Sequence, residues 1–154
     1  MPALLPLPVL VVGVGSELRS DDAAGRRVVD RLVGELPPTS VEIRSVHQLV
    51  PELAADAVGR RLVIVVDASV DVEEVTIREV TAAPSAGAMT HHLDVAALIG
   101  LSAMLGTPPV RVVTVAVPAR SLQLGTTLSP ATARDVDAAV VQVRELCVDH
   151  ERSG

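Results

Sequence analysis

Acidic and histidine side chains stand at three places where a strand pattern ends or a helix pattern begins. The first place is the pair Asp21-Asp22, the second is Asp67 at the end of RLVIVVD, and the third is the pair His91-His92. Two carboxylates and one imidazole are a common ligand set for a borderline divalent metal ion, and they leave coordination positions open for water or substrate. These places are therefore the candidates for metal chemistry.

Each candidate also has an ordinary structural explanation. One of Asp21 and Asp22 is expected to cap the following helix, because a carboxylate at a helix N-terminus accepts backbone N–H groups and complements the helix dipole. Asp67 alone would be interpreted as a turn residue, and a pair of histidines alone is weak evidence for a metal. His47, which follows another strand pattern, fits a substrate contact or a plain loop residue. The metal interpretation depends on all three places meeting at one edge.

Apolar runs of strand type alternate with stretches of helical period. Strands are predicted at residues 9–14, 41–45, 61–67, 72–80 and 110–117, and helices at residues 22–36, 50–58, 91–105 and 130–148. The run at 61–67 is continuously apolar and predicts a central strand, whereas the run at 72–80 alternates and predicts an edge strand. Pro118 to Thr127 and Thr81 to Thr90 have the composition of loops.

This alternation predicts a single α/β domain over residues 1–154, with its core at about 9–148. The expected architecture is a three-layer sandwich, with a mostly parallel five-stranded twisted sheet and helices on both faces. Ligands of such folds bind beyond the carboxyl ends of the strands. Asp21-Asp22, Asp67 and His91-His92 are all predicted to lie at that edge.

Composition narrows the possible functions. The chain has no Phe, Tyr or Trp and a net charge of −6, so it offers neither aromatic platforms for bases nor a basic stripe for nucleic acid or anionic membranes. Its single cysteine, Cys147, rules out an intramolecular disulfide and a cysteine-based zinc site, and its apolar neighbours favour a core position. Without a convincing signal peptide or membrane span, we expect a cytoplasmic protein.

The stretch from Gly13 to Gly15 begins like a dinucleotide-binding turn. Asp21 and Asp22 would then meet a pyrophosphate, and the third glycine, which lets helix and strand pack closely, is missing. Nucleotide binding is therefore the weakest of the functional hypotheses.

The sequence VLVVGVGSELRSDDAAGRRVVDRL resembles the opening of the hydrogenase maturation proteases, whose pattern is matched here by Gly13, Gly15, Leu18, Asp21, Asp22 and Gly25. The resemblance continues in the same order through HQLVPEL, the strand that ends in Asp67, MTHHLDV and LGTTLSPAT. It covers roughly residues 9–148, and the ordered set is more specific than any one motif.

The resemblance implies an endopeptidase that trims the C-terminal extension of a NiFe-hydrogenase large-subunit precursor after nickel insertion. Position by position, it implies that Asp22, Asp67 and His91 are the metal-binding and catalytic residues. His91 matches better than His92, because the leucine usual two positions after the ligand is Leu93. The nickel would arrive with the precursor, and the resting enzyme would be metal-free. It could serve as a recognition element, a Lewis acid or an activator of water, with Asp21 or Asp22 as an assisting base.

Two positions depart from the family pattern. Ser16 stands where relatives usually have asparagine, and Arg120 lies where they often carry an acid. These departures support an alternative, a non-catalytic maturation factor of the same fold that binds the precursor without cutting it.

Overall fold

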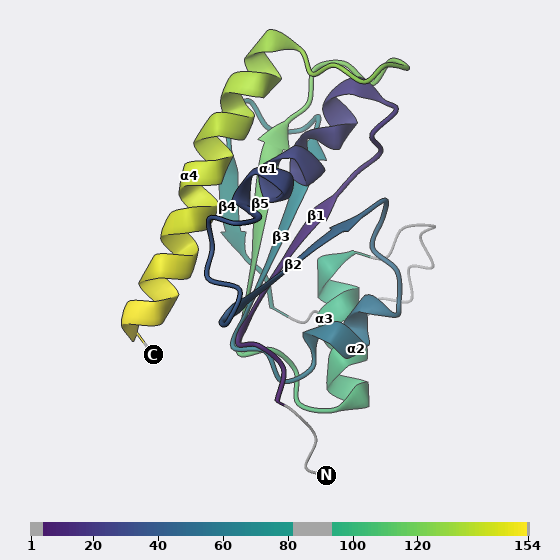
Figure 1. Cartoon of the computed structure of the whole chain (residues 1–154). Helices are drawn as coiled ribbons and strands as arrows, with labels where there is room; N and C mark the ends of the chain where they lie inside the picture. Colours follow the sequence, from purple (N-terminus) through teal and green to yellow (C-terminus); the bar gives the residue numbers. More distant parts are fainter. Residues whose placement is uncertain (1–4, 82–93, 154) are drawn as a thin grey trace.

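The computed structural model describes residues 5–81 and 94–153. Its five strands are β1 (Val9–Val14), β2 (Val41–Val46), β3 (Leu62–Ser69), β4 (Thr76–Glu79) and β5 (Arg111–Pro118). They form one sheet in the order β2-β1-β3-β5-β4. All pairings are parallel except that of β4, which runs antiparallel to β5 at the edge (Figure 1). The predicted mostly parallel five-stranded sheet is confirmed.

The central strand is β3, which pairs with β1 on one side and β5 on the other. Its first five residues are buried, as expected for a strand covered on both faces. The strand continues to Ser69, so Asp67 lies two residues before the end of β3, whereas the sequence predicted that the strand ends at Asp67. The buried apolar run ends at Asp67, but the pairing with β5 continues through Ala68 and Ser69.

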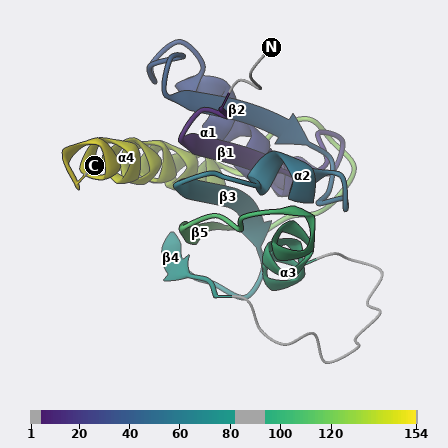
Figure 2. The same cartoon turned by 90° about the horizontal axis from the view of Figure 1, so that it is seen from below.

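The helices are η1 (the 3-10 turn Ser20–Ala23), α1 (Ala24–Leu32), α2 (Leu53–Ala57), α3 (Val95–Leu105) and α4 (Pro130–Ser153). Helices α1 and α4 pack on one face of the sheet, and α2 and α3 pack on the other. Figure 2 shows α4 and the pair α2 and α3 on opposite sides of the row of strands. The three-layer sandwich is therefore confirmed. Among the described residues, no helix is long and apolar enough to cross a membrane.

The first helix is shorter than predicted. It was expected over residues 22–36, but α1 ends at Leu32, where Val33 turns extended and its side chain is exposed. Gly34 then takes a φ of 87°, a conformation that favours glycine. Leu36 is nevertheless buried in the core, which is why the apolar period ran past the end of the helix.

Other helix ends also differ from the prediction. Helix α2 has five residues rather than nine, and α4 continues to Ser153. Helix α3 begins at Val95 instead of residue 91, because the Asp94 side chain accepts the N–H of Ala97 at 2.7 Å and caps it. The predicted loop at 81–90 lies almost wholly outside the described residues, as does the histidine pair.

Helix α1 packs on the sheet through a glycine. A Cβ on Gly25 would lie 2.3 Å from the carbonyl oxygen of Val66 and 2.7 Å from that of Val14. A Cβ on Gly13 would lie 2.6 Å from the carbonyl oxygen of Gly25. Gly25 thus allows the close helix–strand packing that the Gly13-to-Gly15 stretch was expected to lack.

Candidate functional site

The turn after β1 brings the start of the first helix back against the strand. Gly15 has a φ of 149°, and a Cβ there would lie 1.9 Å from the carbonyl oxygen of Asp22. Only glycine allows this approach, because any side chain would overlap the η1 backbone. The turn therefore places the Asp22 region directly beyond the carboxyl end of β1.

Asp22 is held by the same turn. The backbone N–H of Ser16 donates to Oδ2 of Asp22 at 2.9 Å, and the Ser16 hydroxyl accepts the N–H of Leu18 at 3.3 Å. The contact to Asp22 uses main chain, so serine in place of the family's asparagine still supplies it. Asp22 is partly exposed. Among the described residues, no hydrogen-bond donor contacts its second carboxylate oxygen.

Asp21 points the other way and is fully buried. Its carboxylate accepts hydrogen bonds from the backbone N–H groups of Arg120, Ser121 and Ser129 and from the hydroxyls of Ser129 and Thr132. Burial alone would raise its pKa, but these hydrogen bonds outweigh burial and lower the pKa to about 2. Asp21 is a structural anion and not a base.

The expected helix cap is absent. Helix α1 and the preceding η1 have no side-chain cap hydrogen bond, and their flanking residues are Ala23 and Arg19. Asp21 and Asp22 both accept backbone N–H groups, but those groups come from other loops and not from their own helix. The prediction that one of the pair caps the helix was wrong, because tertiary donors replaced local ones.

Asp67 lies at the same edge, beside Val14 of β1 and Ala116 of β5. It lines a cavity of about 240 Å³, together with Leu49 and Val95 from the α2 and α3 side of the sheet. Its side chain reaches solvent, yet the surrounding protein desolvates the carboxylate. This desolvation and then the negative charge of Asp22 raise its pKa to about 6, against the effect of the Ala68 N–H. The negative charge of Asp22 therefore acts on Asp67 at this edge.

His91 and His92 lie outside the described residues, so the prediction that His91 joins Asp22 and Asp67 stays a prediction. His91 lies four residues before Val95 in the sequence, and Val95 lines the cavity beside Asp67. Within the ranges 5–81 and 94–153, no three His, Cys, Asp or Glu side chains converge to hold a metal ion. His47 follows β2 directly and is exposed, as a rim residue would be.

Cys147 and Arg120 both have structural surroundings that account for them. Cys147 is buried in the core between α4 and the sheet, and burial followed by the charge of Glu151 raises its pKa to about 11. Arg120 donates to the Thr132 hydroxyl at 3.0 Å and pairs with Asp135 at 2.8 Å, so its side chain joins its loop to α4.

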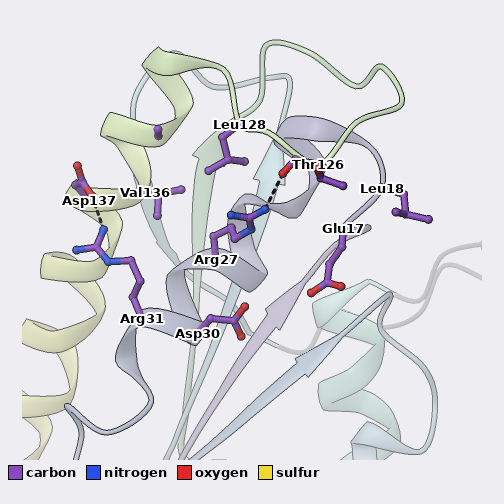
Figure 3. Close-up of a pocket in the computed structure, with 10 residues that line it drawn as sticks. Glu17, Leu18, Arg27, Asp30, Arg31, Thr126, Leu128, Val136 and Asp137 are labelled. Atoms are coloured by element: carbon purple, nitrogen blue, oxygen red, sulfur yellow. Dashed lines mark hydrogen bonds and ion pairs between the residues drawn. The ribbon is translucent and has the colours of Figure 1, made fainter.

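A larger groove, of about 680 Å³, runs between α1 and α4 and holds neither Asp22 nor Asp67. Figure 3 shows the two arginines of the groove directed at partners inside it: Arg31 at Asp137, and Arg27 at the carbonyl oxygen of Thr126. The groove is therefore separate from the predicted Asp22 and Asp67 site.

The fold has counterparts among solved structures. The hydrogenase maturating endopeptidase HybD from E. coli superimposes with a TM-score of 0.78 and 26% identity, over 92% of this chain and 93% of that one. A hydrogenase 2 maturation peptidase from a Thaumarchaeota archaeon gives 0.67 and 26%, over 90% and 97%. These are hydrogenase maturation endopeptidases. The predicted resemblance to that family is confirmed.

A more distant match agrees with these two. The NiFe hydrogenase maturation protease HycI from Thermococcus kodakarensis has a TM-score of 0.68 at 20% identity, over 90% of this chain and 91% of that one, which shows a shared fold. No family model and no curated protein sequence matches the chain. The likeness to the hydrogenase maturation endopeptidases therefore rests on structure and on the ordered motifs.

The sequence left two features of the site unseen. One is the set of donors around Asp21, which come from residues about a hundred positions away, such as the Ser129 hydroxyl at 2.7 Å. The other is the packing role of Gly25. This glycine is part of the family motif, but the motif does not show that it packs against the strands.

Proposed function

We propose that this chain is an endopeptidase that removes the C-terminal extension of a NiFe-hydrogenase large-subunit precursor after nickel insertion. The proposed metal-engaging residues are Asp22, Asp67 and His91. Support comes from the likeness to structures named as hydrogenase maturation endopeptidases over nearly the whole chain. The single observation that carries the site is that Asp22 and Asp67 lie at the same carboxyl edge of the sheet, where the Val14–Asp67 register and the turn after β1 place them.

The carboxylates of Asp22 and Asp67 provide a physical reason for nickel dependence. Two negative charges held together at a partly desolvated edge repel, and a divalent cation brought to them removes that repulsion. A precursor that carries nickel would gain this interaction, whereas a nickel-free precursor would leave both carboxylates uncompensated. Nickel is in this proposal part of the substrate, and a carboxylate-rich set with one imidazole would hold free metal only weakly.

The roles of the neighbouring groups divide accordingly. Asp22, which accepts the Ser16 N–H through one oxygen, would offer its other oxygen to the metal. Asp67, with a pKa of about 6, would be ionised at neutral pH and ready to bind a cation or take a proton. Asp21 cannot share this role, because its lone pairs are already directed at donors of another loop.

The test is a cleavage assay with nickel-loaded precursor, read by intact mass. Asp22→Asn, Asp67→Asn and His91→Ala should each reduce cleavage at least about a hundredfold while leaving the fold intact. His92→Ala and Asp71→Asn are the matched controls, one beside the proposed ligand and one an exposed aspartate after β3. Full cleavage by all three variants would overturn the proposal. If the wild type binds the precursor without cleaving it, the alternative of a non-catalytic maturation factor is favoured.

A further inference from the structure

The carboxylate of Asp21 joins two segments that are far apart in sequence. Oδ2 accepts the backbone N–H groups of Arg120 and Ser121 at 2.8 and 2.9 Å, and Oδ1 accepts that of Ser129 at 2.7 Å. The hydroxyls of Ser129 and Thr132 complete the set at 2.7 and 3.0 Å. Hydrogen bonds to an ionised, fully buried carboxylate are among the stronger ones in proteins.

The same loop also holds the turn that carries Asp22. The Ser20 N–H donates to the carbonyl oxygen of Gly125 at 2.9 Å, and the Asp21 N–H donates to that of Ser121 at 3.0 Å. The Ser20 hydroxyl donates to the carbonyl oxygen of Gln123 at 2.7 Å. Ser20 has a φ of 51°, a conformation unfavourable for serine unless its surroundings hold it. The loop therefore fixes η1 in a conformation that the turn would not hold by itself.

Asp22 is the next residue in that turn, and its only hydrogen-bond donor among the described residues is the Ser16 N–H. A single contact does not fix a side chain in one geometry. Helix η1 has four residues and no capping side chain of its own. The Asp22 N–H donates to the carbonyl oxygen of Arg19 at 3.1 Å, but this contact lies within the same short turn. The buried carboxylate of the neighbouring Asp21 ties that turn to the loop at 119–129.

We propose that Asp21 is a positioning residue, whose buried carboxylate ties the loop at 119–129 to η1 and thereby fixes the Asp22 carboxylate at the edge of the sheet. Its importance for catalysis rests on the proposed function of Asp22. The positioning itself does not, because it concerns the geometry of this chain alone.

The Ser16 amide reports the position of Asp22 directly. An amide that donates to a carboxylate has a characteristic downfield proton shift, and it exchanges slowly with solvent while the contact lasts. Asp22→Asn provides the reference spectrum for a perturbed contact. Asp21→Asn should move the Ser16 amide toward that reference and speed its exchange about ten- to a hundredfold, while amides of β3 stay protected.

A milder pair of variants covers the case in which Asp21→Asn does not fold. Ser129→Ala removes one hydroxyl donor and keeps the backbone one, and Ser129→Thr restores the hydroxyl. Ser129→Ala should shift and destabilise the Ser16 contact, and Ser129→Thr should rescue it. An unchanged Ser16 amide in folded Asp21→Asn, or in Ser129→Ala where the first variant is unfolded, would overturn the proposal.

Cleavage kinetics then separate positioning from general stability. At a temperature well below unfolding, Ser129→Ala should lower kcat several-fold with little change in KM, and Ser129→Thr should recover the wild-type kcat. A loss of activity that only follows the unfolded fraction would overturn the positioning role. If the wild type cleaves no precursor at all, the proposed function fails while the Ser16 measurement still decides the positioning.

Discussion

Asp22 acts electrostatically on Asp67 across the junction between η1 and the central strand. Desolvation and then the charge of Asp22 raise the pKa of Asp67 to about 6. The two residues are far apart in sequence, and they lie at the same edge because Val14 and Asp67 are register partners in β1 and β3. The turn after Val14 then returns the chain over Gly15 to Asp22.

Removing the charge of Asp22 should lower the pKa of Asp67. In Asp22→Asn, desolvation remains while the repulsion is lost, so the pKa should fall below 6 yet stay above 3.8, its usual value. Carboxyl carbon NMR titration measures it. Asp71→Asn, which changes an exposed aspartate nearby, should leave it unaltered. An Asp67 pKa that is the same in Asp22→Asn and the wild type would contradict the coupling.

Asp67 should cost the protein stability at neutral pH. Its folded-state pKa is raised, so the folded chain holds this proton more tightly, and its contribution is lost as pH rises from about 4 through about 6. Asp67→Asn should therefore gain stability relative to the wild type at pH 8, and less so at pH 4.5. Urea unfolding at both pH values tests this. An equal difference at the two values would count against the raised pKa.

Asp21 should have the opposite pH dependence. Its pKa is lowered from 3.8 to about 2, so its stabilisation is complete above about pH 4 and is lost as pH falls toward 2. The linked contribution is about 2 kcal/mol. Asp21→Asn should be less stable than the wild type at neutral pH. Urea unfolding between pH 2 and 6 should show that the variant loses less of its free energy of unfolding than the wild type as the pH falls from 4 to 2. A wild-type slope preserved in the variant would assign the acid sensitivity elsewhere.

Gly25→Ala should destabilise the fold severely. The new Cβ would meet the backbone carbonyl oxygens of Val66 and Val14, which cannot move without parting α1 from the sheet. We expect a loss of about 3 kcal/mol in the free energy of unfolding. Gly100→Ala in α3 is the matched control, since its Cβ would meet no atom within 4 Å. It should gain up to about 1 kcal/mol, as alanine favours helices. Equal effects of the two changes would refute the packing argument.

Cys147 should take no part in cleavage. It is buried and its pKa is about 11, so the thiolate is scarce at neutral pH. Native protein should resist alkylation at Cys147 until it is unfolded, and Cys147→Ala should cleave precursor at the wild-type rate. Rapid alkylation of the folded chain, with matching loss of cleavage, would instead indicate a thiol nucleophile.

The sequence predicted the sheet well because its signals are local. Continuous apolar runs identified β1 and β3, and alternation identified β4 as an edge. Helix ends were less predictable, because Leu36 continues the apolar period after α1 has ended and reaches the core from a loop. Periodicity records burial, and burial does not require a helix.

At the site, the sequence identified the acidic residues but could not divide their roles. Asp21 and Asp22 are adjacent and chemically identical, and the distinction between them comes from donors at Arg120, Ser121 and Ser129. Such long-range partners leave no trace in local spacing. Asp67 stood out because a polar residue interrupts a buried strand, which is a local signal.

The most direct test of the central claim compares nickel-loaded and nickel-free forms of a cognate hydrogenase large-subunit precursor. Each is incubated with the purified wild-type protein, and the product masses are measured. The account predicts loss of a C-terminal peptide from the nickel-loaded precursor alone. Equal cleavage of both forms would contradict nickel recognition by Asp22 and Asp67, and cleavage of neither would contradict the proposed endopeptidase.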